Sequence, residues 1–244
     1  MNSVEILWEG TLSLDHIKWN NENLSHCEYF QEYEVAAKAN WNKHIKTYPH
    51  DYDGNLLFLE GFHLEKDIFH LSISLTKFSI INYLLKQNIL LERGYGALGT
   101  QYLVFSPNRE YILVGERAHT QSYFPGATNV PGGILERDDL THNPSEALIR
   151  ELKEEVSIPL QPKFYLKAIL GGWDNVSVTF LISGVIDNHQ KFDPEQTYPS
   201  DRYEWEGNLR WLSLIELKKM SSYNFLDGLT YYQSKLKEND KVSQ

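Results

Sequence analysis

Three glutamates lie close together in the middle of the chain, at a spacing that suits metal chemistry. Glu151, Glu154 and Glu155 fall three and four residues apart, and such positions share one side of an α-helix. Three carboxylates along one side of a helix repel one another, and divalent cations between them would relieve that repulsion. Carboxylate oxygens favour Mg²⁺, with Mn²⁺ as an alternative, and Mg²⁺ takes its remaining ligands from water and substrate phosphate. The cluster therefore indicates phosphoryl-transfer chemistry.

A helix from Ser145 to Val156 is expected to position these acids. Asn143 is a favourable N-cap, Pro144 suits the first helical position, and Pro159 prevents continuation. The preceding Pro131-Gly132-Gly133 turn allows close backbone approach, so a main-chain carbonyl there can complete a metal shell. A solvated amphipathic helix, whose acids bind nothing, is the competing interpretation. The fixed order of glycine turn, capped helix and arginine-glutamate pair favours the metal site.

The segment Asn129–Pro159 resembles the Nudix box, G-x5-E-x7-R-E-U-x-E-E-x-G-U, in which U is aliphatic. The opening glycine and the R-E-U-x-E-E core match at Gly133, Arg150, Glu151, Leu152, Glu154 and Glu155. The resemblance implies an α+β protein with the Nudix α/β/α sandwich and a mixed sheet, acting as a pyrophosphohydrolase. It also implies Glu151 and Glu155 as the principal metal ligands, with Glu154 assisting and the Gly133 carbonyl contributing. Arg150, Glu151 and Glu154 would then take part in catalysis.

The segment departs from the box in three places. Asp139 stands at the first glutamate, the gap from Asp139 to Arg150 is three residues longer, and Ser157 replaces the last glycine. The insertion around Leu140–Asn143 is expected to form a loop ahead of the helix. Asp139 has a shorter side chain than glutamate and is expected to position Arg150 less well.

Further site residues are expected outside the box. The family often supplies another acid from a later loop as a base or metal ligand, and Glu206 is the favoured candidate. A solvated loop residue is the competing interpretation, and Glu195, Asp201 and Glu204 are alternatives in the same acidic stretch. Tyr123 and Phe124, in the loop His119–Gly126, are candidates to stack on a substrate base, although buried aromatic residues are the commoner case.

The N-terminal half is similar to that of the mammalian Nudix hydrolases that cleave UDP-glucose and UDP-galactose. The similarity follows the order ANWN, LFLEGFHLE, IFHLSISLTKFSIINYL and YGALGTQYLV. It implies hydrolysis of a UDP-sugar to UMP and a sugar 1-phosphate. An ADP-ribose or dinucleotide pyrophosphatase, using the same helix, is the alternative within enzymes. A nucleotide-sugar-binding regulator without turnover is the alternative outside them.

The periodicity divides the chain into an N-terminal α+β region, residues 1–95, and a Nudix domain, residues 96–244. Helices are expected at Glu28–Lys46 and Thr76–Leu85 in the first part, with Ser74 or Thr76 as the N-cap of the second. Gly94, Gly96 and Gly99 spell GxGxxG, but an apolar strand follows them, so the spacing indicates a turn and not a dinucleotide site.

Composition restricts the partners. The formal net charge of −10 repels phosphate backbones, so nucleic-acid binding is not expected, whereas a small nucleoside diphosphate held through metal ions remains compatible. The single cysteine, Cys27, and the absence of a basic-apolar leader in Met1–Leu14 favour a cytoplasmic protein. The apolar runs are too short to span a membrane. A homodimer is possible. The histidines do not fall at zinc-ligand spacings with cysteines, so a structural zinc site is not expected; the ones considered are His63, His70, His119, His142 and His189.

Overall fold

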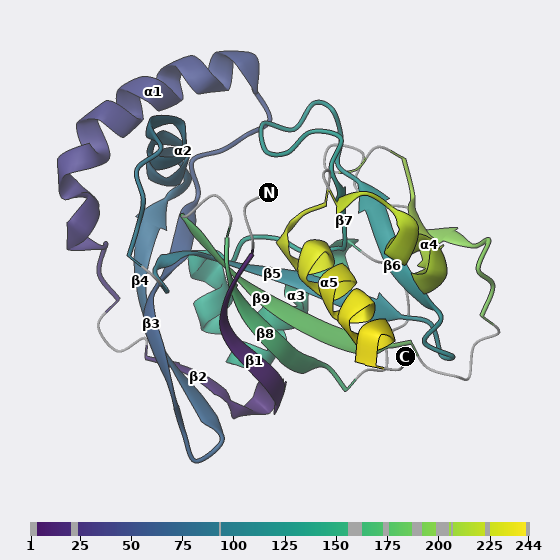
Figure 1. Ribbon diagram of the computed structural model, residues 1–244. Coiled ribbons are helices and arrows are strands. Elements are labelled where there is room, and N and C mark those ends of the chain that lie inside the picture. The colour runs from purple at the N-terminus through teal and green to yellow at the C-terminus, as the bar shows by residue number, and fades with distance from the viewer. Residues whose placement is uncertain are drawn as a thin grey trace.

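The computed structural model describes residues 4–20, 24–92, 94–155, 163–172, 176–186, 192–198, 205, 207–222 and 225–242 (Figure 1). The strands are β1 (Glu5–Ser13), β2 (Ile17–Asn20), β3 (Asn55–Glu65), β4 (Ile68–Lys77), β5 (Gly96–Phe105), β6 (Tyr111–Glu116), β7 (Thr128–Asn129), β8 (Tyr165–Gly171), β9 (Ser177–Val185), β10 (Thr197–Tyr198) and β11 (Leu209–Ser213). The α-helices are α1 (Glu34–Thr47), α2 (Phe78–Gln87), α3 (Pro144–Glu155), α4 (Leu214–Lys219) and α5 (Asp227–Val242).

One mixed sheet runs through the molecule. Its main path has the order β1-β8-β9-β5-β3-β4-β2, and β6 branches from β5 toward β7, β11 and β10. The central pair, β5 and β9, is parallel over nine residues from Ala97↔Ser177 to Phe105↔Val185. Both strands are apolar and mostly buried, as expected of parallel strands that are covered on both faces.

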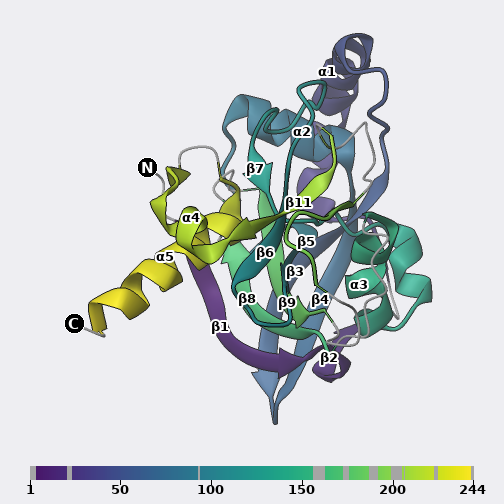
Figure 2. The same cartoon turned by 90° about the vertical axis from the view of Figure 1, so that its right-hand side faces the viewer.

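Helices cover the two faces of this sheet. Figure 2 shows α3 on one side of the central strands and α4 and α5 on the other. The α3 side contacts a core that includes Leu98, Tyr102, Leu148 and Leu152, and the α5 side contacts one that includes Leu103, Leu181 and Leu229. The α+β fold class and the mixed sheet predicted from the sequence are confirmed.

Helix α3 begins where the sequence predicted and is fastened to the sheet. Asn143 caps it, since its Oδ1 accepts the Glu146 N–H at 2.9 Å. Leu148 and Leu152 are fully buried, as their four-residue spacing indicated. The Tyr102 hydroxyl donates to the Leu148 carbonyl at 2.6 Å. Apolar packing and a buried hydrogen bond together hold the helix, and with it the acidic positions, at a defined height over β5.

The N-terminal region extends the same sheet and adds a helical layer. Strand β3 pairs with β5 through Phe58↔Ala97 and Leu59↔Gly96, while β1 pairs with β8 at the opposite edge. The expected boundary at residues 95 and 96 therefore does not separate two sheets. At Gly96 there is no room for a Cβ, because it would overlap the Ser177 backbone of β9.

Helix α2 starts later than expected. The prediction placed it at Thr76–Leu85 with Ser74 or Thr76 as the N-cap, but β4 continues to Lys77, which is the N-cap residue. Ser74 and Thr76 are buried strand positions. The local helix preference was overridden by the antiparallel pairing of β4 with β3, which runs as far as Asn55↔Lys77.

In the described part of the chain, no helix combines the length and the apolar character required to cross a membrane.

Candidate active site

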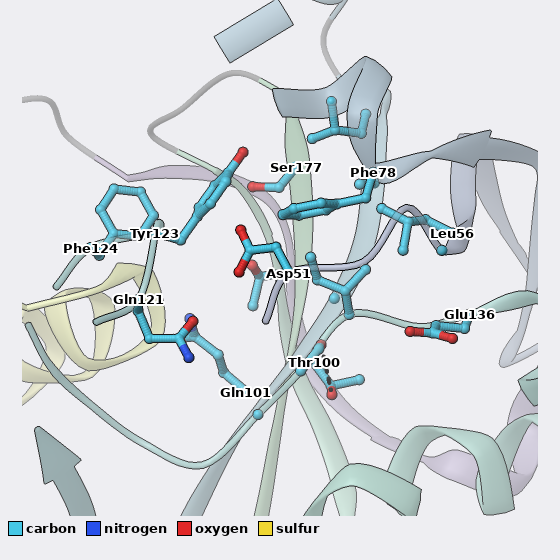
Figure 3. A pocket seen from close by; sticks show the side chains of 18 of the residues that line it. Asp51, Leu56, Phe78, Thr100, Gln101, Gln121, Tyr123, Phe124, Glu136 and Ser177 are labelled. Atoms are coloured by element: carbon cyan, nitrogen blue, oxygen red, sulfur yellow. Dashed lines mark hydrogen bonds between the residues drawn. The ribbon is translucent and has the colours of Figure 1, made fainter. Parts of the chain in front are cut away.

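A cavity of about 710 Å³ opens beside the glycine turn and α3 (Figure 3). Its walls come from five parts of the chain: the α1–β3 connection with α2, strands β5 and β9, the loop after β6, the segment from β7 into α3, and the start of α5. In Figure 3, Asp51, Phe78 and Tyr123 gather in one part of the cavity, and Glu136 lies apart from them. The cavity thus connects the predicted metal end to a second, partly aromatic end.

At the metal end, Arg150 joins two acids. Its guanidinium binds Asp139 through Nε–Oδ1 at 2.5 Å and Nη2–Oδ2 at 3.1 Å, and Nη1 donates to Glu154 Oε2 at 2.7 Å. Asp139 is 1% exposed and also accepts the Glu136 N–H at 2.7 Å. Asp139 thus holds Arg150 through two hydrogen bonds in spite of its shorter side chain. The 3₁₀ turn Arg137–Thr141 contains Asp139 and the first part of the insertion, Leu140 and Thr141.

The Gly132-Gly133 turn is wedged against β5. The Gly133 carbonyl accepts the Thr100 N–H at 2.8 Å and makes a 3.4 Å contact with the Thr100 hydroxyl. That hydroxyl has a shorter bond, 2.9 Å, to the Tyr102 Oη, so one lone pair of the carbonyl is only weakly engaged. A Cβ at Gly132 would overlap the Thr100 carbonyl oxygen. Only a glycine at this position lets the turn approach the β5 backbone so closely.

Glu136 is an acid at the cavity that the sequence analysis did not select. Its partial burial raises the pKa of its carboxyl above the ordinary value; the Arg150 charge opposes this effect, while the neighbouring Asp139, Asp138 and Glu154 carboxylates add to it. A carboxyl with a raised pKa among other acids is a frequent feature of active sites. Its position three residues after Gly133 was the available signal.

Tyr123 and Phe124 both line the cavity, as their selection for substrate binding would require. The centroid of the Tyr123 ring lies 5.8 Å from that of Phe78 of α2 and 5.6 Å from that of Phe124. The loop is held by Arg117, whose Nε donates to the Tyr123 carbonyl at 3.2 Å. Phe124 has a φ of +50°, a left-handed conformation that is uncommon for an aromatic residue. The aromatic wall is thus shared by the loop and the N-terminal region.

A polar network fastens that loop to the N-terminal region. Asp51 Oδ2 accepts the Ser122 hydroxyl at 2.6 Å and lies 2.7 Å from His44 Nε2, and His44 Nδ1 lies 3.0 Å from the Lys86 Nζ. A Lys86 ammonium can only donate, so His44 accepts at Nδ1 and donates from Nε2 to Asp51. Desolvation lowers the pKa of Lys86, and the Asp51 charge opposes this shift. The network joins α1, α2 and the loop around one carboxylate, which also lines the cavity.

The floor of the cavity is polar. Asn129 of β7 is 3% exposed, and its Oδ1 has no hydrogen-bond partner among the described residues. Gln101 of β5 accepts the Gly228 N–H at 2.7 Å and thereby ties α5 to the floor. Buried acceptors without a partner are uncommon in folded proteins, so Asn129 Oδ1 is a candidate contact for a group that donates a hydrogen bond at this wall.

The structure thus brings together part of the predicted site. Gly133, Arg150, Glu154, Tyr123 and Phe124 line one cavity. Glu151 and Glu155 lie on α3, but their side chains are outside the described part of the chain, as is Glu206. The sequence analysis missed Asp51, Phe78 and Asn129, because nothing in their local sequence distinguishes them from loop, core and strand residues.

Comparisons with known proteins identify the family. A model of the NUDIX domain matches residues 98–228, more than half of the chain. No curated protein matches its sequence. Among solved structures, the MutT protein from Methanosarcina mazei Go1 has 18% identity, covering 59% of this chain and 95% of that one, with a TM-score of 0.42. The NUDIX domain of Shewanella oneidensis NrtR complexed with ADP ribose has 15% identity, covering 58% and 88%, with a TM-score of 0.44. A Nudix hydrolase from M. smegmatis, RenU, has 18% identity, covering 63% and 93%, with a TM-score of 0.40. On the family match, the chain belongs to the Nudix family of hydrolases.

Proposed function

We propose that this protein is a Mg²⁺-dependent hydrolase that cleaves UDP-glucose or UDP-galactose to UMP and a sugar 1-phosphate. The observation that carries the proposal is a single cavity of about 710 Å³ that runs from α3 and the glycine turn to the aromatic wall. Cavities of roughly 300–1,000 Å³ hold small ligands in proteins. A nucleotide sugar would lie with its diphosphate beside α3 and its nucleoside beside the aromatic residues.

The described donors at the α3 end fit a hard divalent cation. Glu154 offers Oε1, since its Oε2 binds Arg150, and Gly133 offers a weakly engaged carbonyl lone pair. Both donors are oxygens, which Mg²⁺ prefers. Glu151 and Glu155 are proposed as further ligands from their places in the box. Bound Mg²⁺ would supply charge neutralisation for the diphosphate and an activated water.

The other residues of the site position the metal ligands or accept a proton from the attacking water. Arg150 fixes one carboxylate oxygen of Glu154 and is itself fixed by the buried Asp139. Glu206 and Glu136 are the two candidates for the residue that accepts a proton from the attacking water. For Glu136 the supporting observation is the raised pKa of its carboxyl, which brings it toward the range useful to a general base.

At the other end, the base is expected to stack in the aromatic wall of Phe78, Tyr123 and Phe124. The unpartnered Asn129 Oδ1 suits a donor such as an imide N–H or a sugar hydroxyl. The Asp51 carboxylate adds a second acceptor at this end. An ADP-ribose or dinucleotide substrate would use the same metal end, and its adenine would have to occupy the same wall.

The decisive experiment measures Mg²⁺-dependent product release from UDP-glucose, UDP-galactose, ADP-ribose, NADH and diadenosine polyphosphates. We expect UMP release from the UDP-sugars, with the highest kcat/KM in the panel. Faster AMP release would transfer the assignment to the ADP-ribose class, and tight binding without turnover would make the protein a regulator.

Two charge-matched variants of α3 sharpen this test. Glu155→Gln should lower kcat by at least a hundredfold, because it removes a proposed metal ligand and with it charge stabilisation in the transition state. Glu146→Gln makes the same change at an exposed position of the same helix, outside the cavity lining, and should leave kcat within about twofold. If the two variants lowered kcat equally, Glu155 would not be a metal ligand.

A further inference from the structure

The β3–β4 hairpin forms a projecting end of the molecule, seen at the bottom of Figure 1. Glu65 and Ile68 are the last paired residues, so Lys66 and Asp67 form a two-residue turn. Both turn residues have positive φ, +48° and +64°, as in a type I′ turn, whose twist matches that of the flanking strands. A tight turn of this type fixes the register of the residues just inside it.

In this register, His63 and His70 face each other directly across the two strands. Glu65 follows His63 by two residues and therefore lies on the same face of the hairpin. The next pair, Leu64↔Phe69, lies on the opposite face, where Phe69 is fully buried in the core. The alternation of strand residues therefore collects two imidazoles and one carboxylate on the face turned away from the core.

The side chains of this group are close enough to share an ion. The His63 and His70 rings are stacked, with centroids 4.9 Å apart and an interplanar angle of 10°. One ligand atom from each of His63, Glu65 and His70 lies within 4.8 Å of the other two. In a tetrahedral zinc site, bond lengths of about 2.1 Å place the ligand atoms about 3.4 Å apart. Binding one ion therefore requires the exposed His63 and Glu65 side chains to rotate, which also turns the two imidazoles out of their parallel stacking so that their nitrogen lone pairs converge.

We propose that His63, Glu65 and His70 form a second metal site, which binds Zn²⁺ or a similar transition-metal ion and leaves the fourth position to water. Two imidazoles with one carboxylate suit Zn²⁺, Cu²⁺ and Ni²⁺, whereas Mg²⁺ prefers oxygen ligands throughout. None of the three residues lines the cavity beside α3. The site is therefore chemically and spatially distinct from the proposed Mg²⁺ site, and its ion would link the two strands of the hairpin.

Two neighbouring lysines carry positive charges that oppose metal binding, and replacing one of them tests the site. Lys66 Nζ lies 3.7 Å from Glu65 Oε1, but both side chains are largely exposed, so this ion pair is weak. Lys18 of β2 is the parallel partner of His70 and brings a positive charge near the site. Removing the Lys18 charge should therefore tighten metal binding severalfold.

For the test, the full chain is first stripped of metal and then saturated with Mg²⁺. Zn²⁺ is then added, and its binding is measured by isothermal titration calorimetry. We expect one Zn²⁺ per chain at micromolar or tighter Kd. Zn²⁺ at a hundredfold excess over Kd should raise Tm by roughly 5–10 °C. With Cu²⁺ in place of Zn²⁺, electron paramagnetic resonance should show nitrogen hyperfine structure from two imidazoles.

The variant His63→Ala/His70→Ala should lose this site, with Zn²⁺ affinity reduced at least a hundredfold and the rise in Tm abolished. His16→Ala removes an exposed histidine outside the hairpin and should retain both. Lys18→Gln should bind Zn²⁺ more tightly than the unmodified chain. Absence of a stoichiometric Zn²⁺ site in the Mg²⁺-saturated chain, or a site that survives in the double variant, would overturn the proposal without affecting the hydrolase assignment.

Discussion

The ion pair between Asp139 and Arg150 makes a sharp quantitative test of the site's architecture. The proposed change is Arg150→Met, which keeps an unbranched apolar side chain and removes the guanidinium. Asp139 is 1% exposed and accepts three hydrogen bonds, two from Arg150 and one from the Glu136 N–H. After the substitution, a buried carboxylate would retain one of these three donors.

Breaking a buried ion pair by removing one partner costs about 3–5 kcal/mol. The Arg150 side chain is 30% exposed, so water can reach part of the vacated space, and we expect the lower value, about 3 kcal/mol. For a chain of this size, each kcal/mol changes Tm by roughly 2–4 °C. Arg150→Met should therefore lower Tm by roughly 6–12 °C.

The assay is urea unfolding of a double-mutant cycle with Asp139→Asn. Because each single variant already breaks the pair, the double variant should be clearly more stable than the sum of the two losses predicts, by at least 1 kcal/mol. Lys153→Met, at an exposed position of α3, is the control for loss of a cation and should change stability by less than about 0.5 kcal/mol. A loss below about 1 kcal/mol for Arg150→Met, or an additive cycle, would refute this reasoning.

The same geometry predicts the effect of restoring the residue that the Nudix box has at this position. Asp139→Glu adds a methylene group to a side chain that is already enclosed and paired at short distance with Arg150. Overpacking of this kind typically costs about 1–3 kcal/mol. We expect the variant to be less stable in thermal unfolding, and equal or higher stability would show that the site has spare room.

Three further predictions concern the frame of the cavity. Tyr102→Phe removes the buried hydrogen bond to the Leu148 carbonyl and should cost about 1–3 kcal/mol in urea unfolding; a loss below about 0.5 kcal/mol would contradict the role given to this bond. Gly132→Ala places a methyl group onto the Thr100 carbonyl oxygen, so circular dichroism should show much reduced folded protein, and a Tm like that of the unmodified chain would count against the close approach. The folded-state pKa of Glu136 is raised above its ordinary value of about 4.5, so ionisation of this carboxyl at higher pH lowers the free energy of unfolding. Glutamine stays neutral, so the stability of Glu136→Gln relative to the unmodified chain should increase from pH 4 to pH 7. A stability difference that does not change with pH would argue against the raised pKa.

Local sequence was sufficient for the elements that carry the predicted metal end. The N-cap Asn143, the apolar repeat that includes Leu148 and Leu152, and the glycine turn all act over a few residues. Helix α3, described over Pro144–Glu155, begins one residue before the predicted start, and the predicted end at Val156 lies outside the described residues. The box spacing also identified the family, which the match over residues 98–228 confirms. Patterns of this kind are visible in a single sequence because helix caps and helical periodicity are short-range.

The start of α2 shows where local preference was insufficient. Ser74 and Thr76 are good N-cap residues taken alone, but both belong to β4. The hydrogen bonds that keep them extended come from β3, whose residues lie at a distance in the chain, and burial on both faces favours the strand.

What the sequence by itself determined was the acidic helix with its N-cap and glycine turn, and through them the family and the class of chemistry. The tertiary structure alone decided what faces that helix. Asp51 and Ser122 are 71 residues apart, yet the Ser122 hydroxyl donates to Asp51 Oδ2 at 2.6 Å, and His63 and His70 meet only because their strands pair. The physical reason is that a carboxylate in a loop or a histidine in a strand has the same local pattern whether water or a distant side chain is its partner. Only the packing of distant segments selects that partner.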